Sequence, residues 1–489
     1  MSSKDKDKKK HSHKKHSRRI TKRKILDKLN RLGDQLDEIE SLLRSGNFQG
    51  ATGFQGATGF QGATGPQGAT GPQGATGPRS GIGQIPPALI SQVKLIGQPH
   101  SLAPQQGTSV SLSPDGTILA IGAPQEVDPQ TNQRTGGTWI FERNIEGLWE
   151  QKILLVGRGE NESSTQGTSV SLTQVPGPIT LADRYILAVS DPDPGFVWIF
   201  ERDPLSGLWE QKQILPPNGI EFGSSSALSV ALSRDGTTLA VGSPNDEEDR
   251  GSVFIFTRNS FTGEWTQQGD KLVAISLDDQ SEQGTSVSLS NDGSILAVGG
   301  PCESNGTFTD IGATWIWRRI VDVWDPTLVK KLTGSTNNSA EQGTSVSLSG
   351  DGETVAIGGP NDGSDRGATW IFEINPATGE WEEKQKLVDE TAPTGSRQGT
   401  SVSLSEAGHL LAVGGPGATD ESVGATWIYE KNSAGLWEQK HKLVGSNPIG
   451  NSNQGTSVSL SADGHEVAVG GPNDDGNIGA TWVFMGNLA

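Results

Sequence analysis

The chain has 489 residues, a formal net charge of −18 at pH 7 and one cysteine, Cys302. A single cysteine cannot form an internal disulfide, so the composition excludes a disulfide-stapled secreted domain. No apolar run is long enough to span a membrane, and the first residues lack the apolar stretch of a secretion signal. We therefore expect the chain to be made and assembled in a cytoplasm.

Residues 1–24 form a basic tail that contains 12 Lys or Arg and two Asp. We expect this tail to be disordered, because it has too few apolar residues to form a core. Its positive charge predicts docking on an anionic partner, either nucleic acid or an acidic scaffold protein. A tail that serves only solubility is the alternative.

Residues 25–45 contain a heptad pattern. Apolar residues follow one another at spacings of four, three, four, three and four: Ile25, Leu29, Leu32, Leu36, Ile39 and Leu43. Leucine at the a positions with isoleucine at d shifts a coiled coil from two strands toward three or four. The pattern predicts a short trimeric coiled coil, and a single helix packed on a partner is the alternative.

Residues 50–79 consist of ten Gly-x-y triplets. Glycine at every third position is what a collagen triple helix requires, because only glycine fits at its crowded axis. The segment predicts a collagen-like rod, with a flexible glycine-rich linker as the alternative. Residues 80–89 form a linker to the rest of the chain. Together the coil and the rod predict a homotrimer.

Residues 90–489 contain one motif written seven times. Its opening glycine stands at Gly107, Gly167, Gly284, Gly343, Gly399 and Gly455, and a degenerate copy has Ala227 there. Each copy contains four stretches in which strand formers predominate, separated by turn residues. Seven copies of a four-stranded unit predict an all-β chain with a seven-bladed β-propeller.

The first two strands of a copy are joined by Asp-Gly, as at Asp115-Gly116. This pair predicts a type I′ hairpin turn, in which both central residues have positive φ. The last copy stops after its third strand, whereas Gln92 to Gly97 matches a fourth strand. We therefore expect this N-terminal strand to complete the last blade and close the ring, which removes free sheet edges.

These motifs resemble FG-GAP repeats, the blades of the integrin α-chain propeller. The matching parts are the opening Gly-x-Ser-Val, the Gly-Gly-Pro after the second strand, and the third strand Gly-Ala-Thr-Trp-Ile-Phe. The resemblance implies a propeller. Many FG-GAP blades hold calcium in a loop between strands one and two, but the Asp-Gly turn here is too short to wrap a cation.

The sequence shows no catalytic constellation, and we predict no catalytic residue. His100, His409, His441 and His465 are neither clustered nor placed alike in the repeats. The loop between strands two and three is the candidate metal site, because several oxygen donors in a short loop can hold Ca²⁺. An ordinary Asn/Asp turn without a cation is the alternative. The candidate ligands are Asp246, Asp249, Asp362, Asp365, Asp474 and Asp475.

We therefore expect a non-enzymatic trimeric surface fibre, in which a collagen-like stalk displays propeller heads for adhesion. The loops would bind a host or surface protein or a glycan, and trimeric display would add avidity. The plan is similar to that of collagen-like surface proteins of giant viruses and bacterial spores, which predicts a virion or spore surface. The alternatives are a propeller hydrolase with a site in the central channel and an intracellular, cytoplasmic scaffold.

Overall fold

The computed structural model describes residues 90–488 apart from short gaps. The gaps are residues 129–130, 159–163, 178–182, 194, 217–218, 220–228, 277–279, 308, 337 and 420–421. The predicted basic tail, coiled coil, collagen-like rod and linker lie outside the described residues. None of the helices in the described part is long and apolar enough to cross a membrane.

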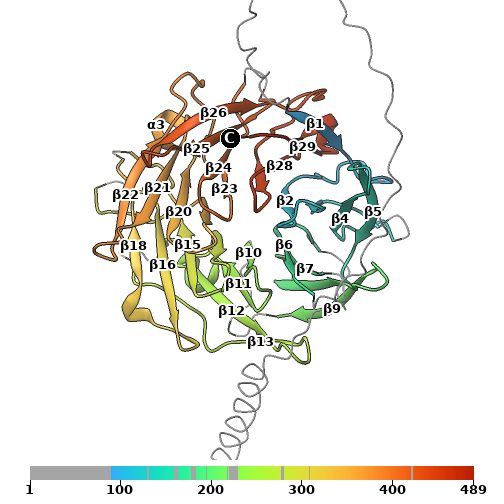
Figure 1. The fold of residues 1–489 in the computed structure, drawn as a ribbon, viewed down its shortest axis with the longest axis horizontal. Coiled ribbons are helices and arrows are strands. Elements are labelled where there is room, and N and C mark those ends of the chain that lie inside the picture. The colour runs from blue at the N-terminus through green and yellow to red at the C-terminus, as the bar shows by residue number, and fades with distance from the viewer. Residues whose placement is uncertain are drawn as a thin grey trace, which may run out of the picture. The chain divides into compact units, whose positions relative to one another are not determined.

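The described residues form an all-β ring of seven antiparallel sheets, a seven-bladed β-propeller, as the repeats predicted (Figure 1). Blade 1 contains β2 (Ser109–Leu112), β3 (Ile118–Gly122), β4 (Thr138–Arg143) and β5 (Trp149–Leu155). Blade 2 contains β6 (Val170–Val175), β7 (Arg184–Asp191), β8 (Phe196–Arg202) and β9 (Trp209–Leu215). Blade 3 contains β10 (Ser229–Leu232), β11 (Thr238–Ser243), β12 (Ser252–Arg258) and β13 (Trp265–Gln267).

The other blades follow the same order. Blade 4 contains β14 (Ser286–Leu289), β15 (Ile295–Gly300), β16 (Ala313–Ile320), β17 (Val323–Trp324) and β18 (Lys330–Leu332), with the turn η1 (Pro326–Leu328). Blade 5 contains β19 (Ser345–Leu348), β20 (Thr354–Gly359), β21 (Ala368–Ile374) and β22 (Trp381–Leu387). Blade 6 contains β23 (Ser401–Leu404), β24 (Leu410–Gly415), β25 (Ala425–Lys431) and β26 (Trp437–Leu443).

Blade 7 is built from both ends of the described chain. It contains β27 (Ser457–Leu460), β28 (Glu466–Gly471), β29 (Ala480–Met485) and, as its outer strand, β1 (Ser91–Leu95). The pairing of β1 with β29 is antiparallel and sets Lys94 opposite Trp482. Figure 1 shows the blue β1 beside the red β29. The predicted closure of the ring by the N-terminal strand is confirmed.

The hairpin between the first two strands differs from the predicted type I′ turn. Gly116 has a φ of 67°, but Asp115 is not among the residues with positive φ. The Gly116 amide donates to the Ser113 carbonyl, and Asp115 Oδ1 accepts from Thr117 N and Ser113 Oγ. The carboxylate thus holds a wider turn together, and only its glycine needs the left-handed conformation.

The serines of the inner strands join neighbouring blades. Ser109 Oγ donates to the Gly167 carbonyl at 2.9 Å, and Ser111 Oγ accepts from the Leu172 amide at 2.9 Å. Between the blades, the third-strand tryptophans are buried: Trp139, Trp198, Trp315, Trp370, Trp427 and Trp482. The repeated serine and tryptophan therefore serve the packing of one sheet on the next.

The opening glutamine fastens one blade to the next, as two repeats show. Gln454 is buried, and its side chain accepts from the Gly445 amide and donates to the Gly445 carbonyl. Gln106 makes the same pair of hydrogen bonds with Gly97. These glycines lie directly over the next blade's tryptophan, since a Cβ on Gly97 would stand 2.3 Å from the Trp139 ring. The segment after each outer strand is thereby held across the following blade as a strap.

Candidate ligand site on blade 1

A buried acid in the loop between the second and third strands recurs in five blades. Four of these acids pair with a lysine, which lies on the outer strand in blades 4, 5 and 7 and four residues after that strand in blade 3. Asp246 lies 2.8 Å from Lys271, Asp362 lies 2.7 Å from Lys386, Asp474 lies 2.6 Å from Lys94, and Glu303 pairs with Lys331. A buried carboxylate is costly without a partner, and the lysine supplies one.

Each of these lysines is positioned by the sheet. In blades 4, 5 and 7 the lysine stands opposite the third-strand tryptophan in the strand register, and its ammonium lies over that ring. The distances from Nζ to the ring centroid are 5.7 Å for Lys331, 5.0 Å for Lys386 and 5.1 Å for Lys94. The aromatic face adds a cation–π attraction to the ion pair.

The ion pairs also hold the lysine in its charged form. Burial alone would lower the pKa of Lys271, but hydrogen bonds to Asp246 and Glu247 outweigh burial and raise that pKa. The ammonium is therefore bound as a cation between a carboxylate and the surface of the sheet. This arrangement is a small cation-binding site that each of these four blades fills with its own side chain.

Blade 1 has the acid and the tryptophan but lacks the lysine. Glu126 is the acid and is 3% exposed. Leu154 stands opposite Trp139 in the register, where blades 4, 5, 6 and 7 have lysine. Glu126 Oε1 accepts from the Ser101 amide at 2.7 Å, whereas Oε2 is buried and has no hydrogen-bond partner among the described residues. Of the five loop acids in the described part of the chain, Glu126 is the one without an ion pair.

A cavity of about 1060 Å³ adjoins this vacant position. Most of its lining comes from three segments, namely the strap from Gln98 to Ala103, the loop that contains Glu126, and β5, and the ring of Trp139 on β4 adds to it. Leu102 on the strap is 94% exposed, and Ile153 on β5 is 40% exposed. The cavity thus combines apolar walls with one buried carboxylate, which is the usual composition of a small-molecule site.

Two further polar atoms at the cavity lack a partner in the described structure. They are Trp139 Nε1 and Ser101 Oγ, and both are buried. In blade 7 the corresponding Trp482 Nε1 donates to the Ser446 carbonyl at 2.8 Å. In blade 1 the carbonyl at that strap position belongs to Gln98, which accepts from Gln151 Nε2 instead.

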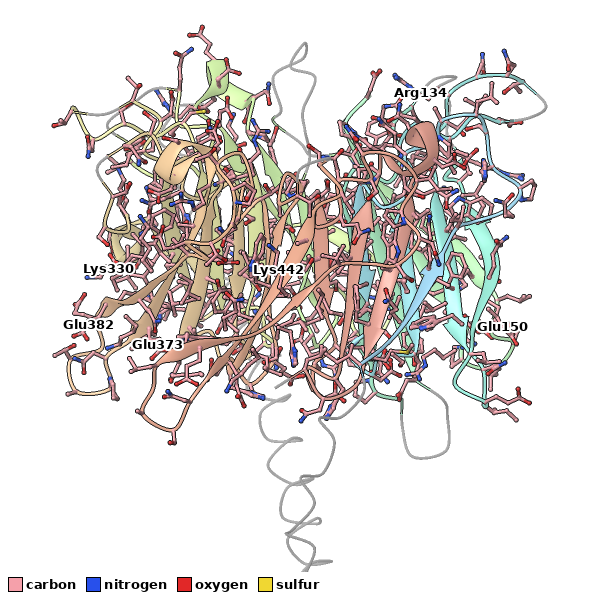
Figure 2. The ribbon with its side chains drawn as sticks, turned by 90° about the horizontal axis from the view of Figure 1, so that it is seen from above. Arg134, Glu150, Lys330, Glu373, Glu382 and Lys442 are labelled. Carbon is pink, nitrogen blue, oxygen red and sulfur yellow. The ribbon has the colours of Figure 1, made fainter. Side chains whose placement is uncertain are left out.

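Two cations also line the cavity, and both are engaged elsewhere. Arg134 Nη1 donates to Gln125 Oε1 at 3.2 Å, and Lys152 Nζ donates to Glu150 Oε2 at 2.8 Å. Figure 2 shows Arg134 among the loops at one end of the strands and Glu150 nearer the other end. Neither cation forms an ion pair with Glu126 in the described structure.

The predicted calcium ligands are placed in two different environments. Asp246, Asp362 and Asp474 are buried against their lysines, in the short turns α2 (Asp246–Asp249), α3 (Asp362–Asp365) and α4 (Asp474–Asn477). Asp365 and Asp475 are exposed, and Asp249 is half-buried. Within the described residues, no group of three or more His, Cys, Asp and Glu could hold a metal ion. A cation in these loops stays a prediction.

Sequence reasoning missed Glu126 and Leu154. The sequence did contain a signal. Lysine stands three positions before Gly97 and before Gly445, as Lys94 and Lys442, whereas Leu154 stands three positions before the equivalent Gly157. The partner acid lies in a separate loop, so the pairing becomes visible only in the folded blade.

Neither a protein-family model nor a curated protein matches the chain. Solved propeller structures do match. A putative 6-phosphogluconolactonase from Bacteroides uniformis is 14% identical, with 69% of this chain and 85% of that chain covered and a TM-score of 0.48. One from Bacteroides fragilis is 14% identical, with coverage of 69% and 84% and a TM-score of 0.46. A periplasmic gluconolactonase from Pseudomonas aeruginosa is 14% identical, with coverage of 70% and 86% and a TM-score of 0.45.

These comparisons correct the sequence-based prediction of a non-enzymatic trimeric surface fibre. These three propellers are described as lactonases, whereas the sequence analysis predicted a chain without enzymatic activity. At this identity the likeness is one of fold, and it assigns no activity to this chain.

Proposed function

We propose that the propeller binds a ligand in the blade-1 cavity, with Glu126 as its polar anchor. The observation that carries the proposal is the unpaired Oε2 of a carboxylate that is 3% exposed, in the one described blade whose loop acid has lost its lysine. A blade that keeps the acid but not its partner retains the cost of burying a charge. A bound ligand that pairs with Glu126 offsets that cost.

The site is also held in place before any ligand arrives. The Ser101 amide fixes one oxygen of Glu126, and the pair of hydrogen bonds between Gln106 and Gly97 anchors the strap that carries Ser101. A side chain positioned in this way loses little freedom on binding, which favours affinity.

The test is calorimetric titration of the full-length chain with a panel of small cationic, neutral and anionic aliphatic fragments. We expect at least one fragment to bind with one site per chain, and that binding to be lost in Leu154→Trp, which places a larger side chain opposite Trp139. The matched control is Ile214→Trp, because Ile214 stands opposite Trp198 at the same register position of blade 2. A panel in which nothing binds, or binding that survives Leu154→Trp, contradicts the proposal.

Hydrolysis is the second candidate, and one observation favours it. Glu341 lies four residues before the inner strand β19 begins at Ser345, and burial together with the negative charge of Asp310 raises its pKa. A carboxyl with a raised pKa is suited to act as a general acid. We expect Glu341→Gln to abolish any turnover found with a panel of esters and sugar lactones, and the exposed Glu353→Gln to retain it. Full turnover by Glu341→Gln removes this candidate.

Four further sequence-based predictions are not tested by the structure, and two of them, the homotrimer and the anionic partner, concern residues outside the described part of the chain. The resemblance to FG-GAP propellers, the homotrimer through residues 25–79, the anionic partner of residues 1–24 and the virion or spore surface stay predictions. Sedimentation of the full chain, compared with a chain that lacks residues 1–80, tests the trimer. A monomeric full-length chain contradicts it.

A further inference from the structure

We infer that the ligand of the blade-1 cavity carries a primary ammonium on an alkyl stem, as a lysine side chain does. The inference rests on the proposed binding function and names its ligand class. Four other blades place a lysine ammonium beside the same loop acid, and in three of them it lies over the same tryptophan. The protein thus contains occupied copies of the site that blade 1 leaves vacant.

Blade 7 is the most detailed of these copies. One oxygen of Asp474 accepts from the Ile449 amide at 2.8 Å, and the other lies 2.6 Å from Lys94 Nζ. Lys94 Nζ also donates to the carbonyl of Asn447 on the strap at 2.9 Å. Trp482 supplies the aromatic face beneath this ammonium. The cation is therefore held by a carboxylate, a carbonyl and a ring.

Blade 1 repeats this framework residue by residue. Ser101 stands four residues after the clamped Gly97, as Ile449 stands four residues after the clamped Gly445, and its amide donates to the loop acid in the same way. Pro99 occupies the strap position of Asn447 and lines the cavity.

The aromatic face is present as well, since Trp139 corresponds to Trp482 in the register. The missing component is the ammonium, because Leu154 has no charge to offer. The same acid, strap amide and ring remain, and they face a cavity instead of a lysine.

The cavity walls suit an alkyl stem. Leu154, Ile153, Leu102 and the Trp139 ring present apolar surface, and the volume of about 1060 Å³ is large enough for a side chain together with its backbone. Burying a chain of methylene groups contributes about 0.8 kcal/mol for each CH₂. A ligand that enters from solvent can therefore place its ammonium at Glu126 and its stem along these residues.

Other ligand chemistries fit less well. A divalent metal ion needs several oxygen ligands, whereas the described residues contain no group of three or more acids, histidines or cysteines that could hold one. An anion would be repelled by Glu126, and the cations Arg134 and Lys152 are already bound to Gln125 and Glu150. The head, residues 81–489, carries 23 basic and 50 acidic residues, a net charge of −27 that attracts cationic ligands.

The experiment is calorimetric titration of the full-length chain with Nα-acetyl-lysine N-methylamide. The matched probe is Nα-acetyl-norleucine N-methylamide, which keeps the stem and lacks the ammonium. We expect the lysine compound to bind with one site per chain and the norleucine compound to bind at least tenfold more weakly. Glu126→Gln is expected to weaken lysine binding at least tenfold.

The occlusion variant is Leu154→Lys, which supplies the ammonium from the strand itself and should abolish binding. Ile214→Lys places a lysine at the same register position of blade 2 and should leave binding unchanged. Equal binding of the lysine and norleucine compounds overturns the ammonium inference and leaves the binding proposal standing. Lysine binding that survives Leu154→Lys overturns the assignment to this cavity, and absence of binding by every probe overturns both.

Discussion

Replacing Lys386 by leucine should reproduce in blade 5 the arrangement that blade 1 has naturally. Lys386 Nζ lies 2.7 Å from Asp362 Oδ2 and 5.0 Å from the centre of the Trp370 ring, and the side chain is 31% exposed. Removing one partner of a buried ion pair costs about 3–5 kcal/mol. Because solvent reaches part of Lys386, we expect Lys386→Leu to lower the free energy of unfolding by about 2–3 kcal/mol.

A double variant separates the lost charge pair from the lost packing. Asn at position 362 keeps an acceptor for Thr336 Oγ1, which now donates to Asp362 Oδ1 at 2.7 Å. Asp362→Asn combined with Lys386→Leu removes both charges and should recover at least about 1 kcal/mol relative to Lys386→Leu alone.

The assay is urea-induced unfolding followed by tryptophan fluorescence, with the denaturant dependence checked to be unchanged. If Lys386→Leu is within about 0.5 kcal/mol of the wild type, the range of ordinary surface substitutions, Lys386 does not stabilise the buried Asp362 carboxylate. A double variant less stable than Lys386→Leu leads to the same conclusion. In either case Lys386 would not be offsetting the cost of burying the Asp362 carboxylate. The missing lysine beside Glu126 in blade 1 would then give no reason to expect a cationic ligand there.

Three other predictions concern the framework of the propeller. Gln454→Leu leaves the buried Gly445 amide and carbonyl without partners, so we expect it to lower the free energy of unfolding in urea by about 2–4 kcal/mol. A decrease of less than about 1 kcal/mol would show that these two hydrogen bonds do not hold the strap in place. Burial raises the pKa of Asp191 to about 6 from 3.8, so its stabilising contribution is present at low pH and is lost as pH rises through 6. Relative to the wild type, Asp191→Asn should therefore gain up to roughly 3 kcal/mol between pH 4 and pH 7, and a constant difference contradicts the shift. Deleting residues 90–97 removes β1 and exposes the edge of β29. We therefore expect concentration-dependent association of the deletion variant in sedimentation, because a free strand edge can pair with another chain. An unchanged sedimentation profile counts against closure of the ring by β1.

The ring, its blade count and its closing strand could be predicted from sequence, because the repeats contain the same strand-forming stretches at similar spacing. The turn after β2 could not be predicted in detail. Asp-Gly is compatible with more than one turn, and the side-chain hydrogen bonds of Asp115 to Ser113 and Thr117 select the wider one.

The blade-1 site could not be predicted for a different reason. Its components come from the strap, a loop and the outer strand, and in blade 7 the corresponding Lys94 and Asp474 are 380 residues apart in the sequence. The pairing of β4 with β5 also shifts register between Ile140 and Phe141, so counting along the strand from Trp149 does not show that Leu154 faces Trp139. A missing partner is visible only when the occupied copies in other blades have been compared in space.

A crystal structure of the protein with Nα-acetyl-lysine N-methylamide is the sharpest test of the blade-1 site. We expect the ammonium within about 3 Å of Glu126 Oε2 and over the face of Trp139, with the stem along Leu154. A ligand bound elsewhere, or Glu126 Oε2 paired with Arg134 or Lys152 in the presence of the ligand, would rule out an ammonium site at Glu126.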